Sequence, residues 1–355
     1  MNRLDDTQLT QLADKLRVWA RELGFQQLGI TDTQLDVAEA RLQDWLAKHY
    51  QGQMDWLGDH GQMRSRPELL NPLTLRVISA RMDYLPETDA WDNLKDGERA
   101  YISRYALGRD YHKLMRKRLA QLADRLRAEV ADSLLGRAFV DSAPVMEKPL
   151  AEKAGLGWQG KHTLIINKQA GSFFFLGEIY TDIPLPIDAP ASNHCGSCSA
   201  CMEICPTGAI VAPYTLDARR CITYLNIEHK GSIDPELRPL MGNRIFGCDD
   251  CQLVCPWNKF ARSTENEAFK PRHQLDQAGL VELFLWDETT WLAKTEGSAL
   301  RRAGYERWLR NIAVALGNGP ATTTAITALR HRLGFSELVD EHVRWALERL
   351  GGRPC

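Results

Sequence analysis

Eight of the nine cysteines in the chain lie between residues 195 and 255. The first four form the pattern Cys-x2-Cys-x2-Cys-x3-Cys-Pro, from Cys195 to Pro206, which is the spacing of bacterial ferredoxins. Thiolates are the ligands of iron-sulfur clusters, and three of them at this spacing can surround one four-iron cluster. The pattern therefore predicts an iron-sulfur protein.

A second run, from Cys248 to Pro256, has the last three cysteines of the pattern and lacks the first. Cys221 is the remaining candidate for that place, although it could instead be a buried apolar cysteine. The fourth cysteine of each run binds the other cluster in two-cluster ferredoxins. We therefore expect two 4Fe-4S clusters with crossed ligand sets. The sets are Cys195, Cys198, Cys201 and Cys255 for one cluster, and Cys205, Cys221, Cys248 and Cys251 for the other.

Zinc and disulfides are the alternatives for so many cysteines. Zinc ribbons use two separated Cys-x2-Cys pairs, not a triplet closed by Cys-Pro. Residues 1–25 contain neither a signal-like apolar segment nor a twin-arginine pair, so we expect a cytoplasmic protein whose thiols stay reduced and hold metal. Cys355 receives no role.

Composition narrows the class of protein. The 355 residues are 44% hydrophobic and 25% charged, with a formal net charge of -2, which excludes nucleic-acid binding through bulk positive charge. No apolar run is long enough to span a bilayer, so we expect no membrane contact.

Apolar residues at alternating spacings of three and four predict two amphipathic helices in the first half of the chain. One has Leu9, Leu12 and Leu16 in its apolar stripe, and the other runs from about residue 110 to residue 135 with basic residues outside. Runs rich in β-branched and aromatic residues predict strands of one sheet. These runs are residues 77–80, 138–140, 163–166 and 172–176.

Three prolines between residues 181 and 190 exclude a helix or a central strand and mark a domain boundary. We expect an α+β protein. Residues 1–185 should form a mixed sheet flanked by helices, and residues 186–260 a ferredoxin-like double-cluster domain. Residues 261–355 should form a helical, HEAT-like segment that contains a helix beginning near Tyr305.

Beyond its cysteines, the chain resembles the epoxyqueuosine reductases. The similar segments are Val-Asp-Ser-Ala-Pro-Val-Met-Glu-Lys at 140–148, Ala-Glu-Lys-Ala-Gly-Leu-Gly-Trp-Gln-Gly-Lys at 151–161, Gly-Glu-Ile-Tyr-Thr-Asp at 177–182 and Gly-Asn-Arg-Ile-Phe-Gly-Cys-Asp-Asp-Cys at 242–251. The resemblance covers residues 1–320 and, together with the cysteine pattern, is highly specific.

The resemblance implies an enzyme that reduces the epoxide of epoxyqueuosine, at the wobble position of tRNA, to queuosine, the last step of queuosine biosynthesis. It also implies base-off cobalamin in the N-terminal domain, with electrons passing through the two clusters to it. A flavodoxin-type or ferredoxin-type protein would supply these electrons. We expect a monomer.

Asp141 occupies the position of the family's proposed proton donor. Removal of an epoxide oxygen as water takes two electrons and two protons, so a positioned acid is needed. For this role, burial has to raise the pKa of Asp141 so that the carboxyl keeps a proton near neutral pH. The alternative is that Asp141 or Ser142 caps a helix that opens at Ala143.

The resemblance also implies a set of cobalamin contacts. Surface exposure is the alternative for Arg64, and core packing is the alternative for Ile165 and Leu176. Ser103 stands where another member of the family has cysteine, which puts its side-chain role in doubt. No Asp-x-His-x-x-Gly motif is present, so we expect cobalt to be bound without a protein histidine, although His162 is nearby in sequence. The full contact set is Arg64, Ser103, Asp141, Ile165, Leu176, Thr223, Cys248 and Asp249.

The segment from Lys294 to Arg332 has seven basic residues and two acidic ones. Such an excess can follow RNA phosphates, with Tyr305 and Trp308 as stacking faces, so we expect tRNA contact here. The alternative is a solvated helix face with tryptophan in the core. The basic residues are Lys294, Arg301, Arg302, Arg307, Arg310, Arg330 and Arg332.

Three other functions are compatible with parts of this pattern. A plain electron carrier would contain no cobalamin. A reductive dehalogenase would use similar cofactors but is normally exported. A module that grips RNA with structural clusters would hold redox-inert iron.

Overall fold

The structure is a computed structural model that describes residues 4–130 and 136–351. Four strands form its main sheet in the order β1, β2, β7, β4, and each neighbouring pair is antiparallel. The predicted mixed sheet is therefore wrong in its strand directions. The strands are β1 (Gln27–Thr31), β2 (Arg76–Asp83), β4 (Arg137–Phe139) and β7 (Phe174–Thr181).

The strand predicted at 163–166 lies outside this sheet. Only β6 (Ile165–Ile166) forms there, and it pairs with β5 (Trp158–Gln159) in a separate ribbon. Thr163 has a φ of 68°, in the left-handed region, so the backbone turns at this residue and cannot continue an extended strand. The other predicted runs fall in or beside β2, β4 and β7.

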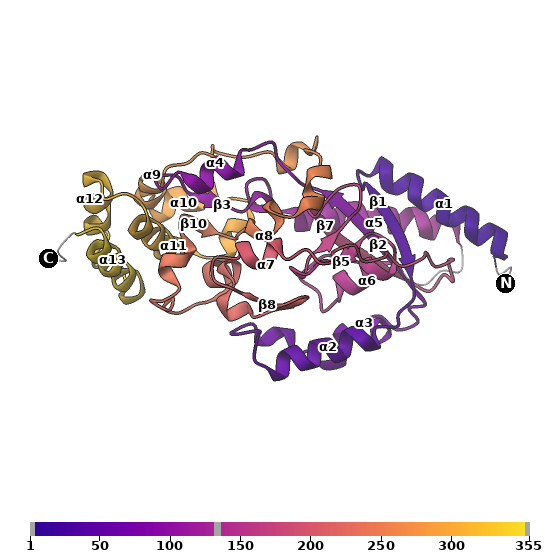
Figure 1. Cartoon of the computed structure of the whole chain (residues 1–355). Helices are drawn as coiled ribbons and strands as arrows, with labels where there is room; N and C mark the ends of the chain where they lie inside the picture. Colours follow the sequence, from indigo (N-terminus) through magenta and orange to yellow (C-terminus); the bar gives the residue numbers. More distant parts are fainter. Residues whose placement is uncertain (1–3, 131–135, 352–355) are drawn as a thin grey trace.

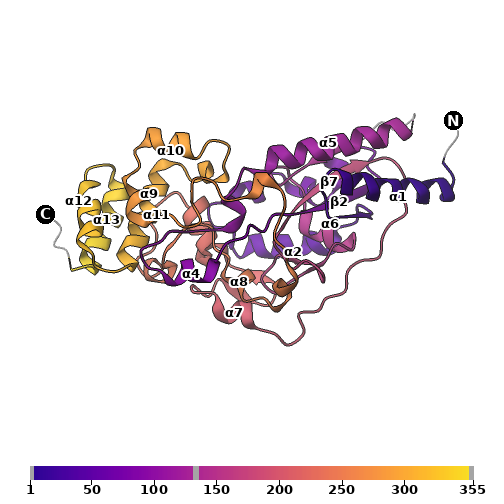
Figure 2. The same cartoon turned by 90° about the horizontal axis from the view of Figure 1, so that it is seen from above.

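Helices cover both faces of the main sheet (Figures 1 and 2). Helices α1 (Asp6–Glu22) and α5 (Tyr111–Glu129) pack on one face, and α6 (Glu147–Lys153) packs on the other. The predicted apolar stripes of α1 and α5 are buried, which confirms both helices. Residues 131–135, predicted to end the second helix, lie outside the described residues.

The period of two along β2 explains why each face receives different helices. Ile78, Ala80 and Met82 belong to the apolar cluster of α1 and α5, whereas Val77 packs with Leu150 of α6. A strand buried on both faces places its polar residues inside the protein as well. Ser79 and Arg81 of β2 are both buried.

The cysteine-bearing segment has little regular structure. Residues 182–199 contain neither helix nor strand, as the prolines predicted. The short elements of residues 200–260 are α7 (Ala200–Ile204), β8 (Ile210–Ala212), β9 (Thr215–Leu216), a π-helical turn (Tyr224–Glu228), β10 (Arg244–Phe246), α8 (Asp250–Leu253) and three 3-10 helices (Ala218–Arg220, Arg238–Met241 and Pro256–Phe260). Short helices α2 (Asp36–Ala47), α3 (Pro67–Leu70) and α4 (Ala90–Lys95) precede them in the chain.

The C-terminal segment is helical, as predicted, and includes a helix that begins at Tyr305. Its core also contains residues 100–107, because β3 (Tyr101–Ile102) pairs in parallel with β10. In Figure 1 this segment and α1 lie at opposite ends of an elongated molecule. No helix of the described residues is long and apolar enough to cross a membrane. The helices are α9 (Leu280–Leu285), α10 (Glu288–Lys294), α11 (Tyr305–Asn318), α12 (Thr323–His331) and α13 (Glu337–Arg349).

Candidate active site

The cysteines of the first predicted set lie together. Helix α7 packs against α8, which brings the second cysteine run beside the first. Burial raises the pKa of the Cys201 thiol to about 11, and the charges of nearby thiolates add to this rise. The neighbouring thiolates are Cys255, Cys195 and Cys198. Cys198 is exposed, so this outer set reaches solvent.

Three cysteines of the second predicted set lie together further inside. Burial raises the pKa of the Cys251 thiol, and Cys221 and Cys205 are near enough to add to the shift. The Cys248 thiol instead donates a hydrogen bond to Asp250 Oδ2 at 2.7 Å. All eight described cysteines are free thiols, and the described residues contain no group of three His, Cys, Asp or Glu placed for one metal ion. In a four-iron cluster each thiolate binds a different iron atom.

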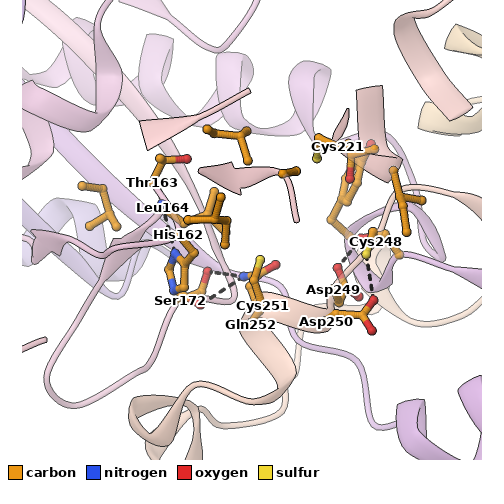
Figure 3. Close-up of a pocket in the computed structure, with 18 of the residues that line it drawn as sticks. His162, Thr163, Leu164, Ser172, Cys221, Cys248, Asp249, Asp250, Cys251 and Gln252 are labelled. Atoms are coloured by element: carbon orange, nitrogen blue, oxygen red, sulfur yellow. Dashed lines mark hydrogen bonds between the residues drawn. The ribbon is translucent and has the colours of Figure 1, made fainter. Parts of the chain in front are cut away.

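A cavity of about 510 Å³ lies between the inner cysteines and the main sheet (Figure 3). Its wall is mostly apolar and includes Tyr84, Phe174 and Phe175. Seven of the eight predicted cofactor contacts line it: Ser103, Asp141, Ile165, Leu176, Thr223, Cys248 and Asp249. Cys205, Cys221 and Cys251 line the same cavity, so sequence positions far apart meet here.

Asp249 and Ser103 form a buried junction at one side of this cavity. The Asp249 carboxylate accepts hydrogen bonds from Tyr101 Oη at 2.8 Å and from the backbone N–H of Arg104 at 2.9 Å, and Ser103 Oγ donates a third. Gly247, with a φ of 69°, makes this approach possible, because a Cβ atom there would lie 2.4 Å from Ser103 Cβ. Asp249 thus fixes the loop that carries Cys248.

Arg64 lies in a second cavity, of about 750 Å³, beside α2. It is 7% exposed, which excludes the surface alternative. Its Nη2 donates to the Trp56 carbonyl oxygen at 3.3 Å, while its Nε has no partner among the described residues. Both cavities are lined by the same five residues at their junction: Asp141, Glu147, Lys148, Thr163 and Leu216.

Asp141 has a backbone φ of 46°, which is rare for a residue with a side chain and is a form of strain that clusters at functional sites. Its Oδ2 accepts hydrogen bonds from Tyr111 Oη at 2.7 Å and faces His112 Nε2 at 3.1 Å. Its backbone N–H donates to Glu147 Oε1 at 2.7 Å. Helix α6 begins at Glu147 without a side-chain cap, so the capping alternative for Asp141 is wrong.

The pKa of Asp141 was expected to be raised, and this expectation is wrong. Burial acts to raise the pKa, but the hydrogen bonds from His112 and Tyr111 and the charge of His112 outweigh it, so the pKa of Asp141 is lowered. Burial acts to lower the pKa of His112, yet hydrogen bonds to Asp110 and Asp141 raise it to about 9. Near neutral pH the pair is an imidazolium and a carboxylate.

Several charged groups of this site were not predicted. Tyr111 and His112 open α5 thirty residues before Asp141, and their spacing in sequence gives no sign of the contact. Lys148 lines both cavities, and burial lowers its pKa. Glu178, by contrast, interrupts the apolar strand β7, and a carboxyl within such a run was a readable signal.

His162 also lines the first cavity. Its Nδ1 accepts the backbone N–H of Leu164 at 3.2 Å, and Nε2 has no partner among residues 4–130 and 136–351. Burial lowers the pKa of His162 to about 4, so the ring is neutral. The expectation that cobalt is bound without a protein histidine stays a prediction.

The basic residues at 294–332 do not form one surface patch. Arg310 is fully buried, and Arg332 donates to the carbonyl oxygens of Phe284 and Trp286. Trp308 is fully buried in the core, which excludes it as a stacking face. Arg301 and Arg302 are exposed. Only part of the segment can therefore meet RNA.

Two family models match the chain. Residues 194–258 match a 4Fe-4S double cluster binding domain, and residues 64–142 match the family described as Epoxyqueuosine reductase QueG, DUF1730. The first range contains all eight clustered cysteines, and the second ends just after Asp141. A domain that binds two 4Fe-4S clusters is thus present in this chain.

Whole-chain comparisons agree. The chain is 63% identical over 344 residues to the epoxyqueuosine reductase of Pseudomonas aeruginosa, covering 96% of this chain and 95% of that one. It is 60% identical over 340 residues to the Escherichia coli enzyme, covering 96% and 89%. The crystal structure of an epoxyqueuosine reductase with an epoxyqueuosine-modified tRNA-Tyr stem loop superposes with a TM-score of 0.87 at 27% identity, covering 96% of this chain and 90% of that one. The chain therefore belongs to the epoxyqueuosine reductases, which are tRNA-modifying oxidoreductases.

Proposed function

We propose that this protein reduces the epoxide of epoxyqueuosine in the tRNA anticodon to the alkene of queuosine, with Asp141 as a proton donor. The observation that carries the proposal is a single cavity lined by both the inner cysteines and Asp141. The bound corrin and clusters would supply the two electrons of the reduction. The residues of the chain hold these groups, exclude water and deliver protons.

The two joined cavities suit a base-off cobalamin. The apolar first cavity matches a corrin face, and the second gives room for a detached nucleotide tail. The unpartnered Nε of buried Arg64 offers a donor for the phosphate of that tail. Of the predicted contacts, Arg64 would hold the tail, while Ile165 and Leu176 would bury the corrin and Ser103, Thr223, Cys248 and Asp249 would border it on the cluster side.

Asp141 and His112 work as a pair in this proposal. When cofactor and substrate fill the cavities, water that solvates the carboxylate is lost, which favours the neutral form of the pair. The proton of His112 Nε2 then moves to Asp141 Oδ2, and Asp141 delivers it to the leaving oxygen. His112 regains a proton from solvent.

A basic surface beside Asp141 suits the phosphates of the tRNA. Lys113, Arg116 and Lys117 are exposed on one face of α5 and make no ion pair among the described residues. Arg116 Nη2 contacts Ser142 Oγ at 3.3 Å, which places this face at the mouth of the site. Exposed Arg301 and Arg302 of the C-terminal segment extend the surface, so the stem loop would lie across both.

The test is an anaerobic preparation assayed for iron, sulfide and corrin, and for conversion of an epoxyqueuosine stem loop by mass spectrometry. Asp141→Ala should keep iron and corrin but lose turnover, whereas Asp124→Ala, on the exposed side of α5, should keep both. Full activity of Asp141→Ala would remove Asp141 from the mechanism. A preparation with zinc or without corrin would contradict the proposed function.

Two further measurements test the ligand sets. Cys221→Ala should lose about half of the iron, because each 4Fe-4S cluster needs four ligands. Unchanged iron would contradict its assignment. His162→Ala should leave the corrin content and the electron paramagnetic resonance spectrum of the loaded protein unchanged, because we expect no protein histidine to bind the cobalt.

A further inference from the structure

Glu178 lies buried in the main sheet, and it makes no ion pair with a basic residue in the part of the chain that the structure describes. It sits in β7 with Ser79 of β2 and Phe139 of β4 as its sheet neighbours. It has no exposed surface, and its Oε1 accepts a hydrogen bond from Ser79 Oγ at 3.3 Å. Its Oε2 has no hydrogen-bond partner within residues 4–130 and 136–351. An isolated carboxylate in such a place is strongly unfavourable, so the residue keeps its proton.

Glu147 connects this buried acid to the active site. It begins α6, which packs on β2 and β7, and its charge acts on the Glu178 carboxyl. Its Oε1 accepts the backbone N–H of Asp141 at 2.7 Å. Glu147 and Asp141 both line the two cavities. Lys148 follows Glu147 in α6, but no ion pair joins them among the described residues, because adjacent helix positions point in different directions.

The reduction needs two protons, and the imidazolium and carboxylate of His112 and Asp141 hold only one that can be transferred. An epoxide plus two electrons and two protons gives an alkene and water. The electrons come from the flavodoxin-type or ferredoxin-type protein that we expect as the electron donor. We propose that Glu147 and Glu178 form a carboxyl pair that stores one proton beside Asp141 and supplies the second proton of each turnover. The inference rests on the proposed function and adds Glu147 as a proton donor and Glu178 as its positioning residue.

In each turnover Glu147 loses its O–H proton, directly or through one water molecule, to the Asp141 carboxylate that has just protonated the substrate oxygen. Glu178 stays protonated and donates a hydrogen bond to the Glu147 carboxylate, which limits the cost of that charge. Glu147 is then reprotonated from the cavity, because Glu178 has no route to solvent of its own.

The surroundings of Glu147 bring its pKa close to neutral pH. Burial raises the pKa of Glu147 to about 8, and the charge of Asp141 adds to the shift. Burial raises the pKa of Glu178 well above its ordinary value, with the charge of Glu147 adding to it. The titratable groups that face the pair are Asp141, Tyr111, His112, Lys148, Tyr180, Glu68 and Arg64.

A pH profile of single-turnover rates, with enzyme reduced beforehand and stem loop in excess, tests the pair. A proton donor must be protonated, so the rate of the unmodified enzyme should fall as pH rises through about 8. Glu147→Gln should lower the rate by about 10²-fold. It should also abolish the fall in rate above pH 8, which is the alkaline limb of the profile. Glu178→Gln should move this fall in rate to higher pH, because an amide N–H is a weaker donor to the Glu147 carboxylate than the carboxyl O–H of Glu178.

Glu129→Gln, at the far end of α5, is the matched control and should leave the profile unchanged. If Glu147→Gln lowers the rate equally at all pH values and keeps the limb, Glu147 only positions the Asp141 backbone and the proposal is wrong. If the unmodified, fully loaded enzyme does not convert the stem loop, the proposed function fails instead.

Infrared difference spectroscopy gives a readout that needs no activity. The unmodified protein at neutral pH should show the carbonyl stretches of two protonated carboxyls. In a pH titration the stretch of Glu147 should disappear as pH rises through about 8, whereas the stretch of Glu178 should remain and should be lost in Glu178→Gln at unchanged iron content. This titration of the unmodified protein also serves if the variant folds poorly. Absence of either stretch at neutral pH would overturn the proposal.

Discussion

Basic residues are concentrated in two regions, and the structure uses them in opposite ways. On α5, Lys113, Arg116 and Lys117 point to solvent beside the active site. In α11, Arg310 is fully buried, with its nitrogens 2.6 to 2.8 Å from the carbonyl oxygens of residues 225, 229 and 231. Helix α5 has six Lys or Arg residues and the segment 294–332, which contains α11, has seven, so burial and partners decide which of them can meet RNA.

The buried arginines have a definite structural task. The π-helical turn at 224–228 and the residues after it leave backbone carbonyl groups without N–H partners, and such groups are costly when buried. Arg310 and Arg307 of α11 donate to these carbonyls, and Asn311 donates to that of Asn226. This turn directly follows Cys221, so the C-terminal helices hold the chain that supports the inner cysteines.

Replacement of Arg310 should have the largest effect on folding. In Arg310→Met the three carbonyl groups lose their donor, and we expect a loss of about 3 to 5 kcal/mol in unfolding free energy. Calorimetry of the cluster-loaded protein should show a Tm lower by at least about 6 °C, with loss of iron from the inner site. Arg116→Met, as the control, should change stability by less than about 0.5 kcal/mol. Equal effects would erase the contrast between the two regions.

The exposed face of α5 should show its effect on RNA binding. With Lys113, Arg116 and Lys117 all changed to Gln, the slope of log K against log salt should fall by about 2, and affinity near 0.1 M salt by about 10²-fold, since each phosphate contact contributes about 0.7 to 0.9 to the slope. Binding of a fluorescent stem loop measures both quantities. Tm should not change.

The double variant Arg301→Gln with Lys294→Gln is the corresponding test of the C-terminal segment in the same binding measurement. We expect a change in slope of at most about 1, because Lys294 is half-buried and Arg301 Nη2 donates to the Leu292 carbonyl at 2.6 Å. A larger loss here than on α5 would place the main RNA surface on the C-terminal helices.

The two regions should also differ in their response to pH. Burial lowers the pKa of Arg310 to about 9, so its guanidinium stays charged and its support should be nearly independent of pH below about 8. The pKa of His112 is raised to about 9 by its carboxylate partners, so its stabilising effect is full below its unfolded pKa and is lost as pH rises toward 9. The difference in unfolding free energy between the unmodified protein and His112→Gln should therefore shrink by about 1 to 2 kcal/mol as pH rises from about 6.5 to 9. Parallel curves would contradict the imidazolium assignment.

How much of this was readable from sequence depends on whether the signal is local. Spacing identified the cysteines, and the stripe of Leu9, Leu12 and Leu16 identified α1, because neighbouring residues on one element carry these patterns. The contact between His112 and Asp141 joins α5 to the loop after β4, and no periodicity records it. The antiparallel direction of the main sheet likewise depends on how long connections fold back.

The sequence predicted the roles of charged residues less well than it predicted the cysteines and helices. Arg310 and Arg301 look alike in sequence, yet α11 is buried on nearly all sides and turns the first of them into a hydrogen-bond donor for backbone. The pKa of Asp141 was misjudged for a related reason. Burial alone would raise it, but donors from α5, distant in sequence, reverse the sign.

Arg302 links the two regions, because it lies in the C-terminal segment of the sequence but close enough to the active site for its charge to act on Asp141. Its Nε lies 2.7 Å from Glu228 Oε1 in a half-exposed ion pair, and its charge acts on Asp141. Arg302→Gln should cost less than about 1 kcal/mol of stability, as is usual for exposed pairs. Because its charge helps lower the pKa of Asp141, the same change should raise that pKa slightly, measurable by carboxyl NMR titration. Glu228→Gln should leave Arg302 charged and should not raise the pKa of Asp141; a rise in both variants would mean that the pair acts through the shape of the rim and not through charge.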